Sequence, residues 1–135
     1  MTDTELAWCA GIIDGEGTIT LKDNGNDHVM PAILFTMTHE STVRRFHKIM
    51  KVGTVSKLNF PQSPNHKYKY TWNATSANAV VVIKLLQPYL FTKLSQAILA
   101  LEFSERCWKQ QLTDQQRILR RVLVDEMRDL NKKGP

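Results

Sequence analysis

The sequence predicts an α+β fold in which a four-stranded, mainly antiparallel sheet carries helices on one face. Stretches that alternate between apolar and polar residues are separated by stretches of helical spacing. Their order along the chain is α-β-β-α-β-β-α, followed by further C-terminal helices, which is typical of a layered α+β domain. With 135 residues, of which 42% are hydrophobic, the chain is expected to form a single domain, 1–135, with a sizeable core.

The first helix is predicted to begin at Thr2, which forms a capping box with Glu5, and to run to about Ile13. Its helical spacing creates two stripes, with Trp8 and Ile12 between them. An apolar stripe consists of Leu6, Cys9, Ala10 and Ile13, and a stripe of small residues consists of Ala7, Gly11 and Asp14. Because no face is left for water, we expect a second helix to cover the small stripe, and in so small a domain it fits a second copy of the chain.

Four alternating stretches predict the strands, over residues 18–23, 30–38, 53–59 and 67–74. DNGND (23–27) is a turn signal between the first two strands, and FPQSPN (60–65) reads as a loop. The polar face of the sheet would carry Thr20, Lys22, Thr36, Ser56, Lys67, Lys69, Thr71 and Asn73. Such a face is usually just solvated, but a concave one would fit the major groove of DNA.

Serine and threonine residues mark the remaining helices. Ser41 is expected to cap the second helix, Ser76 a helix that ends before Pro88, and Thr92 the next one. A last helix starts near 113–114, and its tail, 132–135, would fray. The inward residues are predicted to be Val43, Phe46, Ile49 and Met50 in the second helix, Leu94, Ala97, Ile98 and Leu101 in the fourth, and Ile118, Val122 and Leu130 in the last.

Composition restricts the class of protein. A net charge of +5 and a pI of about 9.4 favour nucleic-acid binding slightly, although simple solubility explains them equally well. No apolar run approaches the roughly 20 residues that span a bilayer, and the start does not resemble a signal peptide. Cys9 and Cys107 have no metal or redox spacing, which suits a reducing interior. We therefore expect an intracellular protein without a membrane partner, and the sequence does not distinguish a bacterial or phage cytoplasm from an organelle.

The stretch CAGIIDGEG, residues 9–17, ends the first helix with two carboxylates, Asp14 and Glu16. Acids at a helix C-terminus oppose the macrodipole and cost about 0.3–1 kcal/mol each unless a cation is near. Gly15 and Gly17 would allow a close backbone approach and positive φ. A divalent ion such as Mg²⁺, bound by carboxylate, carbonyl and water oxygens, would supply the missing charge. A solvated, glycine-rich turn is an equally good reading of these residues.

The same stretch resembles the signature motif of the LAGLIDADG homing endonucleases. Cys9 stands in place of the usual first Leu, Gly15 of the second Ala and Glu16 of the second Asp. A second segment, LLQPYLFTKLSQA (85–97), is similar to the family's Pro-Tyr-Leu…Lys…Gln-Ala segment. The resemblance covers a core of about 5–105, with C-terminal helices over about 92–132, and it implies that the sheet forms a concave DNA-binding face.

The resemblance also implies a homodimer, because single-motif members of the family pair their motif helices at a twofold axis. We found one copy of the motif in the sequence. The implied dimer interface consists of Ala7, Trp8, Gly11, Ile12 and Asp14.

By the same resemblance, Glu16 would bind the catalytic metal, with Gly15 beside it. Mg²⁺ is the expected ion, and Mn²⁺ or Ca²⁺ could occupy the site. Asp14 would mainly support the helix end, and Lys93 would lie near the attacking water or the phosphate. His39 would place or deprotonate water, as a Gln does in some members, or it simply caps the next helix.

The function implied is site-specific, metal-dependent cleavage of both strands of a long, roughly palindromic DNA target, as in intron homing. Candidate DNA-binding residues are Lys22, Asn24, Asn26, Thr36, Ser56, Lys57, Lys67, Lys69, Thr71 and Asn73. Arg44, Arg45 and Lys48 would hold phosphates or face water. The alternatives are a non-cleaving relative, either an intron RNA maturase or a transcription regulator, and a structural interaction protein.

Overall fold

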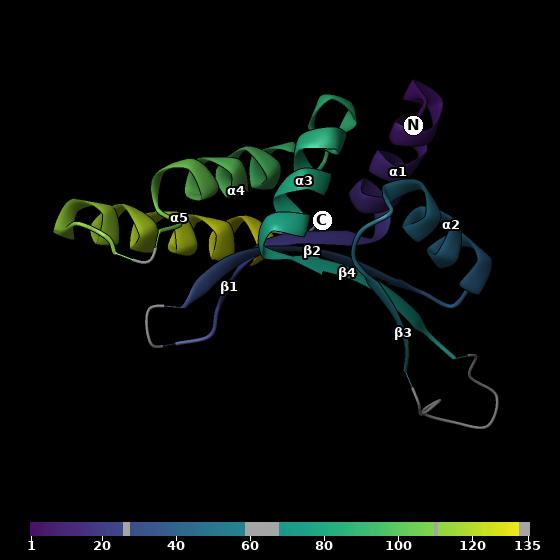
Figure 1. Ribbon diagram of the computed structural model, residues 1–135, viewed down its shortest axis with the longest axis horizontal. Helices are drawn as coiled ribbons and strands as arrows, with labels where there is room; N and C mark the ends of the chain where they lie inside the picture. Colours follow the sequence, from purple (N-terminus) through teal and green to yellow (C-terminus); the bar gives the residue numbers. More distant parts are fainter. Residues whose placement is uncertain (26–27, 59–67, 110, 133–135) are drawn as a thin grey trace.

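The computed structural model describes residues 1–25, 28–58, 68–109 and 111–132. Four strands form one sheet: β1 (Gly17–Asp23), β2 (Val29–Met37), β3 (Thr54–Lys57) and β4 (Tyr70–Thr75). The strand order is β1-β2-β4-β3, and every neighbouring pair is antiparallel. The sheet arches away from the helices, so its open face is concave (Figure 1).

The helices lie on the convex side of the sheet (Figure 1). They are α1 (Asp3–Glu16), α2 (Glu40–Met50), α3 (Ser76–Leu86), α4 (Leu94–Arg106) and α5 (Asp114–Lys132), with a short 3₁₀ helix, η1 (Gln87–Tyr89), between α3 and α4. The predicted α+β class, element order and one-sided helical layer are therefore confirmed.

Aromatic packing between α2 and the sheet fixes the half of the molecule that contains β3. The Phe46 ring lies 4.7 Å from Phe35 and 4.5 Å from Trp72, between ring centroids. The Trp72 indole N–H donates to the carbonyl oxygen of Val52 at 3.0 Å. Gly53 follows with φ +90°, and a Cβ there would lie 2.6 Å from the indole nitrogen. Only glycine fits this approach, which brings the chain into β3.

Helix α1 begins as the sequence predicts and ends one turn later. Thr2 and Glu5 form both hydrogen bonds of the capping box. The Thr2 N–H donates to the Glu5 carboxylate at 2.9 Å, and the Glu5 N–H donates to the Thr2 hydroxyl at 3.0 Å. Cys9, Ala10 and Ile13 are fully buried, and burial raises the pKa of the Cys9 thiol to about 12, so that it stays protonated. Of the predicted stripe of small residues, Ala7 and Gly11 are exposed in the single chain, and Gly15 is exposed one turn farther on. Asp14, predicted for this stripe and for the dimer interface, is half-buried and bonded to the chain's own backbone instead.

Three predicted caps are wrong. His39, rather than Ser41, caps α2. Thr75 precedes α3 without a side-chain cap, and the Ser76 hydroxyl lies 3.5 Å from the Met30 sulfur instead. Lys93, rather than Thr92, is the N-cap residue of α4. At α2 the cap is a local contact between His39 and Thr42, whereas the start of α4 is fixed by a long-range contact, from the Lys93 N–H to Asp14.

The predicted inward faces of the last two helices need correction. In α5, Ile118 is 67% exposed and Val122 45% exposed, while Leu123, Val124 and Met127 are buried. Leu130 packs partly against the core as expected. In α4, Ile98 is 49% exposed, whereas Ala97 and Leu101 are buried. Across the described ranges, no helix has the length and apolar character that a membrane crossing requires.

Candidate functional site

Glu16 is the last residue of α1, and β1 begins at the next residue without a connecting loop. This junction depends on Gly17, because a Cβ there would lie 2.8 Å from the Ile13 Cα. The predicted close approach is thus confirmed at Gly17, but the predicted positive φ is wrong, since φ is −96°. Glu16 is exposed, and its carboxylate forms no hydrogen bond or ion pair with another described residue.

Asp14 is tied to the segment that leads into α4. Its Oδ2 accepts the backbone N–H of Phe91 at 2.9 Å, and its Oδ1 accepts that of Lys93 at 3.0 Å. Residues almost eighty positions apart in the chain are therefore joined by one carboxylate. Because Lys93 begins α4, this acid lies at the positive end of that helix, which offsets its unfavourable place at the end of α1.

This link brings Lys93 to the end of α1 that carries Glu16. The Lys93 side chain is half-buried. Farther along α1, the Tyr89 hydroxyl donates to Asp3 Oδ1 at 2.7 Å, a bond that raises the pKa of Tyr89. The η1–α4 connection is thus attached to both ends of α1. The backbone of Lys93 therefore lies at the C-terminal end of α1, the end that also carries Glu16.

His39 lies between β2 and α2, where its ring caps the helix. Nδ1 accepts the backbone N–H of Thr42 at 3.3 Å and lies 2.7 Å from the Thr42 hydroxyl. The structure therefore supports the capping role that the sequence left open. Nδ1 is engaged, so Nε2 is the ring atom left for a water or a phosphate.

The concave face is built from side chains in register across the four strands. One row runs Thr18, Leu34, Asn73, Thr54, and the next runs Thr36, Thr71, Ser56. The Thr36 and Thr71 hydroxyls are 2.8 Å apart, and the Asn73 amide donates to the Thr54 hydroxyl at 3.2 Å. The predicted face residues Lys22, Thr36, Ser56, Thr71 and Asn73 share this side by strand alternation. Lys69, one residue before β4, is in phase with Thr71.

Other candidates for DNA binding are placed differently. Lys57 pairs with Tyr70, in phase with Val55 and away from this face, and its ammonium lies 3.9 Å from the centroid of the Tyr68 ring. Asn24 follows β1 in the hairpin turn and is exposed. Asn26 and Lys67 lie outside the described residues. Thr18 and Thr54 are not among the DNA-binding residues predicted from the sequence, although strand alternation alone places them on this face.

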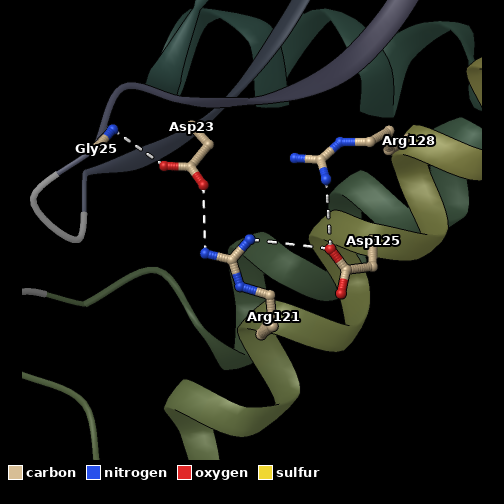
Figure 2. A network of polar contacts seen from close by, with 5 residues as sticks. All are labelled: Asp23, Gly25, Arg121, Asp125 and Arg128. Atoms are coloured by element: carbon tan, nitrogen blue, oxygen red, sulfur yellow. Dashed lines mark hydrogen bonds and ion pairs between the residues drawn. The ribbon is translucent and has the colours of Figure 1, made fainter.

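The hairpin turn between β1 and β2 is attached to α5 (Figure 2). Asp23 Oδ1 accepts the Gly25 N–H at 3.1 Å, which shapes the turn, and Oδ2 lies 3.4 Å from the Arg121 guanidinium. Arg121 in turn lies 3.9 Å from Asp125, which is 3.8 Å from Arg128. Exposed pairs of this kind contribute little stability. Of these pairs, the one between Arg121 and Asp23 joins α5 to the end of β1, next to Asn24.

Basic residues also line a groove between α1 and α2 on the helical side of the molecule. Its lining consists of Met1, Glu5, Ser41, Arg44, Arg45, Lys48, Ile49 and Lys51. The Arg45 guanidinium lies 4.3 Å from the centroid of the Trp8 ring, and Arg44 forms an ion pair with Glu40 at 2.7 Å, which lowers the Glu40 pKa. Trp8 and Ile12 are partly buried against the chain's own core, which leaves Ala7, Gly11 and Gly15 as the open part of the α1 surface.

The donors at the end of α1 are compatible with Mg²⁺ if part of its shell comes from elsewhere. Mg²⁺ is commonly held by one or two carboxylates, with water and phosphate oxygens completing its coordination. Glu16 offers one exposed carboxylate per chain. No group of three or more His, Cys, Asp or Glu residues is gathered in the part of the chain that the structure describes. A single chain therefore resembles part of such a site rather than a complete ion cage.

Solved structures share this architecture. I-CvuI, described as a homing endonuclease in complex with the I-CreI target, superposes with a TM-score of 0.79 at 22% identity, over 98% of this chain and 84% of that one. The archaeal intron-encoded homing endonuclease I-Vdi141I, complexed with DNA, gives 0.79 at 16% identity, over 98% and 87%.

A larger protein matches over part of its length. The LAGLIDADG meganuclease I-AabMI, bound to uncleaved DNA, gives a TM-score of 0.65 at 16% identity, over 87% of this chain and 43% of its own. No protein-family model and no curated protein matches the sequence, so the likeness rests on structure. The resemblance read from CAGIIDGEG is confirmed at the level of architecture: the chain has the fold of the LAGLIDADG homing endonucleases.

Proposed function

We propose that this chain is a divalent-metal-dependent DNA endonuclease that acts as a homodimer and cuts both strands of a long, roughly palindromic target. The observation that carries the proposal is the pair of hydrogen bonds that the Asp14 carboxylate accepts from the backbone N–H groups of Phe91 and Lys93. It joins the two sequence segments that resemble the family, and it brings the lysine to the same end of α1 as Glu16. The fold shared with DNA-bound endonucleases supports the same reading.

Homodimer formation is proposed through the exposed stripe Ala7, Gly11 and Gly15 of α1. A Cβ at Gly11 or Gly15 would meet nothing within 4 Å, so the chain itself gives neither glycine a steric reason. Small residues let two helix backbones approach closely, and a twofold axis along this stripe would place two copies of Glu16 near each other. A dimer with this twofold symmetry would bind a palindromic target, in which the two half-sites have the same sequence.

At the cleavage site, Glu16 from each protomer would hold the divalent ion, and Gly15 lies beside it. When bound, that ion polarises the scissile phosphate and lowers the pKa of a coordinated water. The Lys93 ammonium would stabilise the negative charge that develops on the phosphate oxygens. His39 Nε2 would orient a water molecule. The concave face of the sheet would contact base edges in the major groove of the DNA.

Substitution of Glu16 tests the catalytic assignment. Cleavage is measured on a plasmid library with randomised inserts, in Mg²⁺ and in EDTA. We expect the wild-type protein to cut selected plasmids in Mg²⁺ only, and Glu16→Gln to lose cleavage by at least about a hundredfold while DNA affinity stays nearly unchanged. Glu126→Gln, which alters an exposed glutamate of α5, is the matched control and should cut normally.

The same assay separates the other functions. A Glu16→Gln protein that cuts at the wild-type rate would contradict the role of Glu16. Salt-sensitive binding by the wild-type protein without cleavage would identify a non-cleaving regulator, and preference for structured RNA would identify a maturase. A protein with no affinity for nucleic acid would be a structural interaction protein.

A further inference from the structure

Strand β2 presents apolar side chains on the concave face, which is otherwise built from hydroxyl, amide and amino groups. Met30 and Leu34, both partly exposed, alternate with the core residues of this strand, whereas Ala32, on the same side between them, is only 1% exposed. Leu34 lies at the centre of a row, with Thr18 on one side and Asn73 on the other. It is not part of the hydrophobic core, which lies on the helical side of the sheet.

A single partly exposed leucine such as Leu34 is common on protein surfaces and needs no explanation by itself. The position of Leu34 is different, because its partners across the sheet, Thr18 and Asn73, can donate and accept hydrogen bonds, as can the next row, which consists of Thr36, Thr71 and Ser56. A leucine offers neither a donor nor an acceptor. Pressed against a guanine or adenine edge, it would leave the N7 or O6 acceptors without a partner, and burial of an unpaired polar group is costly.

The one apolar group that a base pair presents in the major groove is the 5-methyl group of thymine. Contact between this methyl group and a leucine buries apolar surface on both partners and leaves no polar atom unpaired. Neighbouring Thr18 and Asn73 can bond to the acceptors beside it.

We propose that Leu34 is a specificity-determining residue that recognises the 5-methyl group of a thymine at one position in each half of the DNA target. This inference rests on the proposed function, because it assigns part of the substrate that the concave face would bind. Leu34 is not among the polar residues that the sequence predicts to bind DNA.

The strand register places this thymine in the inner part of each half-site, the part nearest to Glu16 and the proposed twofold axis. Leu34 pairs with Thr18, two residues after Glu16, whereas the outer end of the hairpin lies beyond Lys22 and Met30. At about 3.3 Å per residue, Met30 is about 13 Å farther out along β2. The thymine read by Leu34 would therefore lie close to the bond that is cut.

Selection of bound sequences from a pool of randomised duplex DNA tests the proposal. Wild-type protein should select thymine at an inner position of each half-site. Leu34→Gln should change the preference at that position toward adenine, which glutamine reads through N6 and N7, and leave the other positions unchanged. Val81→Gln, a matched substitution of an exposed valine on α3, should select the wild-type site.

A second measurement needs no variant protein. Replacing that thymine by uracil removes only the methyl group and should weaken wild-type binding about fourfold, the effect of one buried methyl group. Thymine and uracil should bind equally well to Leu34→Gln.

The outcomes separate the two proposals. If wild-type and Leu34→Gln select the same site, or if uracil at every selected thymine position binds as well as thymine, the assignment of Leu34 is overturned while DNA recognition stands. If no sequence is selected at all, the inference falls together with the proposed function.

Discussion

At the scale of single residues, the two glycines around Glu16 have different physical roles. A Cβ on Gly17 would lie 2.8 Å from the Cα and 2.9 Å from the carbonyl oxygen of Ile13, which are backbone atoms that cannot rotate away. A Cβ on Gly15 would meet nothing within 4 Å. Gly17 is therefore required by the chain itself, whereas any requirement for Gly15 must come from another molecule.

Gly17→Ala should lower the free energy of unfolding by about 1–3 kcal/mol, the usual cost of forcing an extra group into a packed site. Gly15→Ala is the matched control. It places alanine at an exposed helical position and should leave the stability of the monomer unchanged or raise it by up to about 1 kcal/mol. Urea unfolding of the two variants measures the difference, and equal midpoints would contradict the steric account of the α1–β1 junction.

At the scale of elements, Asp14 connects α1 to the start of α4. Both of its oxygens accept backbone N–H groups there, and its removal would leave these donors to water or unpaired. The connection also determines where Lys93 lies relative to Glu16, so its loss should affect both stability and catalysis.

Asp14→Ala should lower the free energy of unfolding by about 1–3 kcal/mol and slow cleavage even under conditions in which the variant is fully folded. Asp14→Asn retains one carbonyl oxygen as an acceptor, so both its stability and its cleavage rate should fall less than those of Asp14→Ala. Circular dichroism during urea unfolding gives the stability, and single-turnover cleavage at saturating protein gives the rate. Cleavage at the wild-type rate by a folded Asp14→Ala protein would show that this link does not position Lys93.

Element types and their order could be predicted because local spacing determines them. The hairpin of β1 and β2, the amphipathic α2 and the capping box of α1 all follow from residues that are close in sequence. The inward face of α5 could not be predicted in this way. Its sequence has apolar residues on two sides, Ile118 and Val122 on one and Leu123 and Met127 on another, and the contacts of α5 with α4 and β1 select the second.

The candidate site was predictable only in part, for the same reason. Motif resemblance identified Glu16 and Lys93, and it assigned Asp14 a supporting role. Periodicity does not show that the Asp14 carboxylate bonds to residues 91 and 93, because that contact spans almost eighty positions. Strand alternation, in contrast, already separates Lys57 from Ser56, because consecutive residues of β3 point to opposite faces of the sheet.

At the scale of the whole molecule, the exposed stripe of α1 is the surface that a second copy would cover. Gly11 is at its centre, between Ala7 and Gly15, with the η1–α4 connection on one side of the helix and α2 on the other. Because the stripe has almost no side chains, a partner helix could pack backbone to backbone along it. A large side chain at Gly11 would hold the two helices apart without disturbing either chain's own core.

Gly11→Leu should therefore leave the fold intact and abolish the dimer. Leucine is a good helix former, so the substitution removes a helical glycine at an open position and should raise the stability of the monomer by up to about 1 kcal/mol. Analytical ultracentrifugation should show a dimer for the wild-type protein and a monomer for the variant at the same concentration. Ala77→Leu, at an exposed alanine of α3, is the matched control and should remain dimeric.

DNA cleavage by Gly11→Leu tests whether double-strand cleavage needs the dimer, because each monomer carries one Glu16. If two copies of Glu16 must meet at the twofold axis, loss of the dimer should remove double-strand cleavage at protein concentrations that saturate the half-site. A monomeric wild-type protein that still makes double-strand breaks would contradict both the α1 interface and the shared metal site. A dimeric Gly11→Leu protein would place the interface elsewhere on the chain and leave the open glycines of α1 without a structural reason.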